Sequence, residues 1–190
     1  MKKIYLMRHS VAQKIDLPTE LIPISDEGII LAKAKIENFI NISKCFSSPY
    51  KRAIETAELI TNQVTIVNNL HERIIGDAKD KDFWIKQYEN HDYRNQNGES
   101  LNEVRERMKA AIELILEDMC DEEEVLLVSH ATAICAYLMN FCEVEVMDTQ
   151  TKARKIAYKN EIIMNGVFPN TAYFEIEYEN NEVNSISFYE

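Results

Sequence analysis

The chain has 190 residues, of which 46% are hydrophobic and 28% are charged, and its formal net charge is −11. This composition is typical of a globular protein with a buried core, and we predict a single domain over residues 1–190. The negative charge would repel a polyanion, so nucleic acid is not an expected partner.

Neither a membrane span nor a metal-binding pattern is expected from the sequence. No apolar run reaches the roughly 20 residues that cross a bilayer. Arg8 and His9 interrupt the first apolar run too early for a signal peptide. The four cysteines contain no Cys-x-x-Cys pair and no zinc spacing, so we expect free thiols, with Cys45 and Cys135 buried. We therefore expect a cytoplasmic protein with no membrane partner and no metal site.

The first part of the chain alternates short apolar runs with helical patterns. Ser25 is placed to cap a helix, and Ala53, Ala57 and Ile60 share one face of a second helix. The predicted elements are a strand over residues 4–7, a helix over 25–40, a strand at 45–46, a helix over 49–61 and a strand over 64–67.

The same alternation continues in the second part of the chain. Ser100 and Glu103 form a capping box that opens a long helix with apolar residues at helical spacing. Asn180 and Asn181 are typical of a turn between two strands. The predicted elements are a helix over residues 101–119, a strand over 125–128, a helix ending at 138, and strands over 174–178 and 183–188.

Strands that alternate with helices predict an α/β fold, a three-layer sandwich in which helices cover both faces of a mainly parallel sheet. The C-terminal hairpin makes this sheet mixed, with about six strands. Residues 73–97 fit no strand-helix unit, because they are polar, charged and aromatic, and we predict that they form a small inserted cap.

Several basic residues could contact a second anionic group of a ligand, although we interpret most of them as a solvated charged surface. They are Arg73, Lys79, Lys81, Lys86 and Arg94 in the predicted cap, and Lys152, Arg154 and Lys155 in a second segment that we expect to be irregular.

Polar side chains that suit an anion follow the predicted strands. Arg8, His9 and Ser10 follow the first strand, Arg52 lies in the first turn of the helix after the second, and His130 follows the strand over residues 125–128. Ligands of open α/β sheets bind at the carboxyl ends of the strands, where helix N-termini add positive charge. Glu72, after the third strand, is expected at the same edge, whereas His71 and His91 are interpreted as structural.

Six segments, in order along the chain, resemble motifs of the histidine phosphatase (phosphoglycerate mutase-like) superfamily. The segments are residues 6–10 (LMRHS), 24–28 (ISDEG), 47–57 (SSPYKRAIETA), 70–72 (LHE), 97–100 (NGES) and 128–131 (VSHA). The family patterns closest to them include Arg-His-Gly, Ser-Ser-Pro-x-x-Arg-Ala-x-x-Thr-Ala and Ser-His-Gly. Each motif alone is weak, but together they are specific and cover most of the chain.

The resemblance implies a metal-independent phosphatase that needs no cofactor and acts on a small-molecule phosphate ester. In this mechanism His9 attacks phosphorus and becomes a phosphohistidine, while Arg8 and Arg52 hold the phosphate oxygens. His130 supplies a further donor when protonated. Glu72 protonates the leaving alkoxide and then activates the water that hydrolyses the intermediate.

Two positions depart from the family pattern. Ser10 stands where the pattern has the glycine after His9, and Ala131 stands where it has the glycine after His130. Both replacements are small, so we expect the pocket to be retained with a slightly altered shape. We also predict that the hydroxyl of Ser10 adds a donor to the phosphate.

Three other functions fit parts of the pattern. A 2,3-bisphosphoglycerate-dependent mutase is disfavoured because Ala12 and Ile15 replace polar residues of the mutase motif. A phosphohistidine-protein phosphatase is disfavoured by Glu72 and by residues 73–97. A catalytically silent module that binds a phosphorylated ligand is disfavoured because His9, Glu72, Arg8, Arg52 and His130 are all present.

Overall fold

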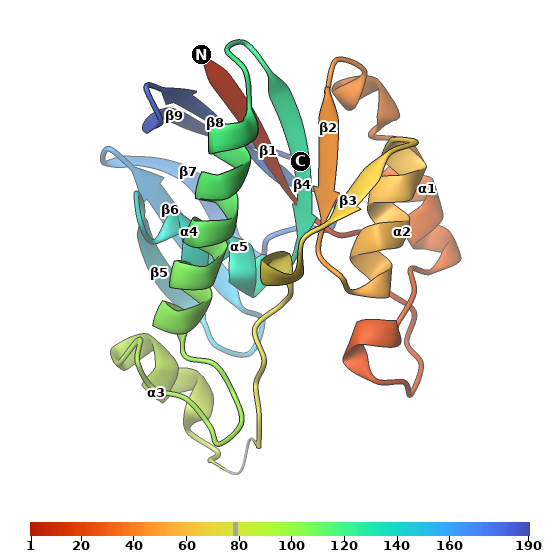
Figure 1. Cartoon of the computed structure of the whole chain (residues 1–190). Coiled ribbons are helices and arrows are strands. Elements are labelled where there is room, and N and C mark those ends of the chain that lie inside the picture. The colour runs from red at the N-terminus through yellow and green to blue at the C-terminus, as the bar shows by residue number, and fades with distance from the viewer. Residues whose placement is uncertain (78–79) are drawn as a thin grey trace.

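The structure is a computed structural model that describes residues 1–77 and 80–190. Its centre is a mixed six-stranded sheet with the strand order β3-β2-β4-β1-β8-β9 (Figure 1). The central strand β1 pairs in parallel with β4 and antiparallel with β8, so the predicted mixed sheet is confirmed. The strands are β1 (Lys2–Arg8), β2 (Lys44–Ser47), β3 (Val64–Ile66), β4 (Glu124–Ser129), β8 (Tyr173–Glu179) and β9 (Glu182–Tyr189).

The sheet buries both of its faces, because successive side chains of a strand point to opposite sides. Ile4 and Leu6 of β1 belong to the core under α4 (Leu101–Asp118) and α5 (Ala131–Leu138). Tyr5 and Met7 belong to the core on the other face, under α2 (Lys51–Ile60). The helix α1 (Asp26–Lys33) packs beside α2, which completes the predicted three layers.

Both predicted helix caps are present. The Ser25 hydroxyl accepts the backbone N–H of Gly28 at 3.1 Å. In the capping box, Ser100 accepts the N–H of Glu103 at 3.1 Å, and the Glu103 carboxylate accepts the N–H of Ser100 at 2.8 Å. These bonds fix where α1 and α4 begin, and both helices start at the carboxyl edge of the sheet or beside it.

The predicted helix over residues 25–40 is too long. Helix α1 ends at Lys33, and a separate short 3-10 helix, η2 (Ile36–Phe39), follows it. This break turns Phe39 towards the sheet, where its ring lies 5.2 Å from Tyr5 and 5.0 Å from Tyr173, centroid to centroid. Burial of the aromatic ring offsets the helical hydrogen bonds that the break removes.

The segment expected to be irregular forms a second, three-stranded antiparallel sheet. Its strands are β5 (Glu143–Asp148), β6 (Ala153–Tyr158) and β7 (Glu161–Gly166). Most residues of β5 are exposed and acidic side chains alternate with valines, so the segment lacks the apolar run of a core strand. The turns use left-handed Lys152, Lys159 and Asn160 instead of glycine. The alternation from Glu143 to Val146 has the period of two that is typical of a strand.

Residues 73–97 extend beyond the N-terminal end of α4 and contain one helix, α3 (Phe83–Glu89), seen at the lower end of Figure 1. Their role as a cap stays a prediction, and Lys79 lies outside the described residues. The remaining elements are the 3-10 helices η1 (Thr19–Leu21) and η3 (Asn68–Leu70). Among the helices that the structure describes, none is long and apolar enough to cross a membrane.

Candidate active site

Two histidines meet where two neighbouring parallel strands end. Arg8 pairs with Ser129 at the last register position of β1 and β4. The backbone N–H of His9 donates to the carbonyl of Ser129 at 2.9 Å. A histidine directly follows each strand, His9 after β1 and His130 after β4. The centroids of the two rings lie 4.9 Å apart. Helix α2 follows the adjacent strand β2 and brings Arg52 to the same place.

His9 is held as one neutral tautomer. Its ring Nδ1 lies 2.6 Å from the carbonyl oxygen of Ser10, which can only accept, so Nδ1 carries the hydrogen. Its Nε2 accepts a hydrogen bond from Nε of Arg52 at 3.1 Å. The side chain is 8% exposed. Burial, followed by the charge of Arg52 and more weakly that of Arg8, lowers the pKa of His9 to about 3, against the raising effect of the Ser10 carbonyl. Nε2 therefore keeps an unprotonated lone pair.

His130 is also neutral in this arrangement. Nη2 of Arg52 lies 3.3 Å from its Nδ1, and a guanidinium can only donate. The hydrogen therefore sits on Nε2, which donates to the hydroxyl of Ser48 at 2.8 Å. Burial, then the charges of His9 and Arg52, lower the pKa of His130 well below its ordinary value. The expected donor role of His130 thus requires an anion that favours its protonated form.

Two arginines provide positive charge at the site without a carboxylate partner. Within residues 1–77 and 80–190, neither Arg8 nor Arg52 has a carboxylate within 4.0 Å, the limit for an ion pair. Arg52 also donates to the carbonyl of Thr19, and Arg8 donates to that of Phe168. The Nε of Arg8 is buried and makes no hydrogen bond there. A buried and a half-buried cation without counter-charge are suited to bind an anion.

Ser10 does not present its hydroxyl as we expected. Its Oγ donates to the carbonyl of Gly28 at 2.7 Å, and its backbone N–H donates to Thr56 Oγ1 at 2.9 Å. Gly28 is itself required at the start of α1, because a Cβ there would lie 2.4 Å from the carbonyl oxygen of Val11. The hydroxyl of Ser10 links the end of β1 to α1, which does not favour a direct role in phosphate binding.

Glu72 lies at the N-terminus of α5, directly beside the histidines. Its Oε1 accepts the backbone N–H groups of Arg73 at 2.8 Å and Ala133 at 3.0 Å. Its Oε2 accepts the N–H of Thr132 at 3.4 Å. These donors at the N-terminus of α5 hold the carboxylate in a defined position.

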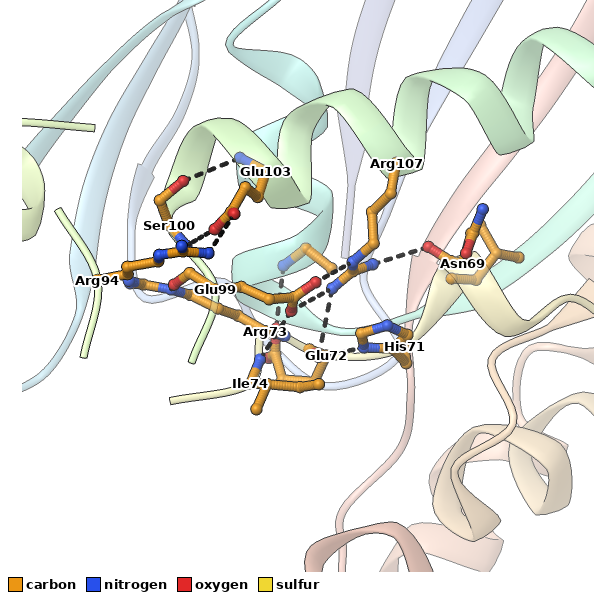
Figure 2. A network of polar contacts seen from close by, with 12 residues as sticks. Asn69, His71, Glu72, Arg73, Ile74, Arg94, Glu99, Ser100, Glu103 and Arg107 are labelled. Atoms are coloured by element: carbon orange, nitrogen blue, oxygen red, sulfur yellow. Dashed lines mark hydrogen bonds and ion pairs between the residues drawn. The ribbon is translucent and has the colours of Figure 1, made fainter. Parts of the chain in front are cut away.

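A network on α4 fixes the segment that carries Glu72 (Figure 2). Arg107 donates to the carbonyl of Asn69 at 2.7 Å and to that of Glu72 at 3.4 Å. It also forms a two-point ion pair with Glu99, at 2.7 and 3.0 Å. Glu99 in turn accepts the N–H of Ile74 at 2.9 Å. Contacts from Arg107 and Glu99 therefore hold the chain before and after Glu72.

The sequence analysis did not identify Arg107 as a residue of the site. Arg107 lies one helical turn after Glu103 of the capping box, and this position is the only local signal for it among the motifs. Glu99, a second glutamate near the site, serves this network. Burial raises the pKa of Glu99, but the hydrogen bonds from Arg107 and from the N–H of Ile74, with the charge of Arg107, outweigh burial and leave the pKa below its ordinary value. A Glu99 carboxylate that is charged at neutral pH is suited to a structural role.

Tyr50 and His71 also lie at the site. The Tyr50 ring is 4.9 Å from the ring of His130 and 5.0 Å from the guanidinium carbon of Arg52. The His71 ring stacks on Tyr50 at 6.2 Å, and its Nδ1 lies 2.7 Å from the carbonyl of Glu72. His71 therefore lies against residues of the site, and its neighbours in the sequence do not indicate this. Tyr50, in contrast, belongs to the same sequence motif as Arg52.

A cavity of about 710 Å³ adjoins Glu72 and extends towards α3. It is lined by Thr19, Glu20, Tyr50, Glu72, Arg73, Ile74, Ile75, Gly76, Trp84, Thr132 and Lys152. Residues of the predicted cap thus form part of its wall. In the part of the chain that the structure describes, no group of three His, Cys, Asp or Glu side chains could hold a metal ion.

Arginines and histidines gathered at the carboxyl ends of a largely parallel sheet define an α/β protein whose sheet edge has the charge to suit a phosphate-sized anion. The model of the histidine phosphatase superfamily (branch 1) matches residues 4–160. The chain belongs to this superfamily.

Solved structures of phosphatases share the fold at low sequence identity. Mycobacterial glucosyl-3-phosphoglycerate phosphatase in complex with inorganic phosphate has a TM-score of 0.73 at 18% identity, covering 100% of this chain and 95% of that chain. A mutant phosphoserine phosphatase from Entamoeba histolytica with phosphoserine has a TM-score of 0.68 at 18% identity, covering 98% and 97%.

A putative alpha-ribazole-5'-P phosphatase from Escherichia coli has a TM-score of 0.70 at 17% identity, covering 98% of this chain and 95% of that chain. At such identities the likeness concerns the fold alone. A comparison with curated proteins found no match.

Proposed function

We propose that the protein is a metal-independent phosphomonoesterase that acts on a small phosphorylated metabolite through a phosphohistidine at His9. The state of His9 carries this proposal. Its Nδ1 hydrogen is held by Ser10, so the lone pair of Nε2 points into the group of Arg52 and His130. A nucleophilic histidine needs this neutral tautomer, and the surrounding cations suit the phosphate that it attacks.

In the proposed first step, phosphate oxygens replace His9 as the acceptor of the Arg52 Nε hydrogen bond. Arg52, Arg8 and a protonated His130 then hold the three non-bridging oxygens. The His9 Nε2 lone pair forms a bond to phosphorus as the bond to the ester oxygen breaks. Fixed positive charge stabilises the charge that develops on the transferring group.

Glu72 is proposed to act as the proton donor to the leaving oxygen and then as the general base. In this proposal the protonated form of Glu72 acts on the bound ester. Glu72 gives this proton to the departing alkoxide. The resulting carboxylate then takes a proton from water as the water oxygen attacks the phosphohistidine, which releases phosphate and restores His9.

The alternative whose chemistry is most similar to that of the proposed phosphatase is a mutase. The positions of two residues disfavour it. Ala12 forms a backbone bridge with Ile24, and Ile15 is exposed at the surface. Neither apolar side chain can donate a hydrogen bond to a second phosphate group. A catalytically silent binding module would hold phosphate with the same arginines and histidines. Phosphoryl transfer to His9 distinguishes a phosphatase from such a module.

The proposal is tested by trapping the phosphoenzyme. After rapid quench with p-nitrophenyl phosphate, the wild-type protein is expected to carry an acid-labile, base-stable phosphoryl group. His9→Ala is expected to carry none and to lose turnover while its circular dichroism spectrum is kept. His91→Ala, a histidine outside the site, is the matched control and is expected to behave as wild type. A phosphoenzyme in His9→Ala, or none in the wild type, would contradict the proposal.

A further inference from the structure

Lys152, at a turn of the second sheet, lines the cavity that adjoins Glu72, and Arg154 lies close to it along the chain. Lys152 stands at the turn between β5 and β6, where its backbone is left-handed with φ of 61°, and it lines the cavity together with Glu72. Its Nζ lies 4.4 Å from the ring centroid of Trp84, which belongs to α3. Arg154 at the start of β6 is 2% exposed and donates to the carbonyl of Lys152 at 3.3 Å.

Among the described residues, no carboxylate forms an ion pair with these two cations, whereas several of their basic neighbours are paired. In the described ranges, 1–77 and 80–190, neither Lys152 nor Arg154 has a carboxylate within 4.0 Å. Lys155, on the same strand, pairs with Glu145. In the predicted cap, Lys86 and Arg94 are likewise paired, with Asp80 and Glu103 respectively. Two cations without a carboxylate partner among the described residues thus lie on or near the wall of this cavity.

Lys152 and Glu72 line the same cavity. Burial lowers the pKa of Lys152, the carboxylate of Glu72 raises it, and Arg154 and Arg8 lower it. A ligand that occupies this cavity beside Glu72 also comes within reach of the Lys152 ammonium.

The size of the cavity leaves room for more than a phosphate. Pockets of about 300–1,000 Å³ accommodate whole small molecules, and this cavity measures about 710 Å³. Its wall carries the flat faces of Trp84 and Tyr50 as well as the apolar side chains of Ile74 and Ile75. The alcohol part of a substrate can therefore lie against these surfaces while its phosphate is in the cradle.

From these observations, and resting on the proposed function, we infer that the substrate carries a second anionic group on its alcohol part, and that Lys152 binds this group. Arg154 is a positioning residue, because its hydrogen bond holds the turn that presents Lys152. The second group is a carboxylate or a second phosphoryl group, and both present negatively charged oxygen atoms to the ammonium. Trp84 keeps the ammonium over the cavity through its ring face.

Matched aryl phosphates test this inference. The probes are 3- and 4-carboxyphenyl phosphate against the corresponding carbamoylphenyl phosphates, and 1,3- and 1,4-phenylene bisphosphate against phenyl phosphate. Wild type is expected to favour the anionic member of at least one pair by about 10-fold in kcat/KM, as for a charged hydrogen bond. The favoured pair identifies the anion.

Three variants assign the preference to one residue. Lys152→Met is expected to bring the ratio close to one, and Lys152→Arg is expected to keep it. Lys155→Met, the control on the same strand, is expected to leave the ratio unchanged. Equal kcat/KM values for every pair in wild type, or a preference that persists in Lys152→Met, would overturn the inference.

A binding measurement separates failure of this inference from failure of the proposed function. Trp84 is the single tryptophan of the chain, so its fluorescence reports on the cavity. 4-Hydroxybenzoate is expected to change this emission at lower concentration than 4-hydroxybenzamide, in wild type but not in Lys152→Met. If no phosphate ester is turned over, this difference would still support the anion site while the phosphatase proposal fails. Equal binding of both compounds would count against the anion site.

Discussion

At the scale of single residues, the site combines groups that are unfavourable to bury. His9 and His130 are neutral because they lie beside Arg52 and are removed from water. Arg52 is buried and Arg8 is half-buried, and neither has a carboxylate partner among the described residues. Such an arrangement costs folding free energy, which a bound phosphate would return by neutralising the arginines.

This arrangement predicts that His9 makes stability depend on pH. Its pKa is about 3 when folded and near the ordinary value of 6.5 when unfolded, so the unfolded state binds more protons between these values. The contribution of His9 is therefore full above pH 6.5 and is lost as pH falls towards 3. In this window it changes the free energy of unfolding by up to about 1.4 kcal/mol per pH unit.

Urea unfolding of wild type and His9→Gln from about pH 7 to pH 4 measures this contribution. The wild type is expected to lose stability more steeply than the variant as pH falls, because glutamine cannot take up a proton. Curves of equal slope would show that His9 is not held neutral.

Glu72 predicts a dependence on the leaving group. An alkyl alkoxide needs a proton to leave, whereas p-nitrophenolate does not. Glu72→Gln is therefore expected to slow the single-turnover release of an alkyl alcohol by about 10² to 10⁴-fold, and that of p-nitrophenol far less. Single-turnover release is the suitable measurement because the later hydrolysis is common to all substrates. Equal slowing of both, or selective slowing in Glu99→Gln instead, would remove Glu72 as the proton donor.

At the scale of elements, the site is built from strand ends and helix starts. Strands β1 and β4 deliver His9 and His130, while α2 delivers Arg52 from its first turn. Glu72 stands in the segment after η3, outside any helix or strand, so it depends on contacts with α4 and α5 for its position. The strength of those contacts predicts which helix residues matter for activity.

Arg107 is expected to be the most sensitive of these contacts. The side chains of Arg107 and Glu99 are only 12% and 18% exposed, and Arg107 also binds two backbone carbonyls. Arg107→Met is expected to lower the free energy of unfolding by about 2 kcal/mol. It is also expected to lower kcat for alkyl phosphates more than it raises KM, because Glu72 loses its position while the phosphate cradle is intact.

Arg94→Met is the matched control for this prediction. Arg94 pairs with Glu103, with side chains 57% and 46% exposed, and such a pair contributes less than about 1 kcal/mol. Urea unfolding and steady-state kinetics of both variants measure the difference. An equal loss of stability in the two variants, or unchanged kcat in Arg107→Met, would contradict the prediction.

At the scale of the whole molecule, a formal charge of −11 surrounds a local positive site. The positive charge comes from arginine guanidiniums, which keep their proton at neutral pH. The described residues contain no cluster of three metal-ligating side chains.

This composition predicts activity without a metal ion. Exhaustive chelation followed by dialysis is expected to leave kcat/KM for p-nitrophenyl phosphate unchanged, since Arg8 and Arg52 supply the charge that a metal would otherwise provide. Loss of activity that a single divalent ion restores would contradict this prediction. A mock-treated sample carried through the same dialysis is the control.

The sequence by itself determined the central sheet, the cap positions of α1 and α4, and the main candidates for the site. Alternating hydrophobicity marks strands locally, and a histidine or arginine directly after a buried strand must lie at its carboxyl end. His9, His130, Arg8 and Arg52 could therefore be placed together from sequence alone. These inferences needed only local patterns and the topology of a parallel sheet.

Only the tertiary structure decided how the side chains meet. The contact between Lys152 and Trp84, the support of Glu72 by Arg107, and the stacking of His71 on Tyr50 each join segments far apart in the chain. The same holds for Ser10, whose hydroxyl turned to Gly28 instead of the cavity. Side-chain direction, tautomer and counter-charge depend on which groups surround a residue after folding, and local sequence patterns do not encode those neighbours.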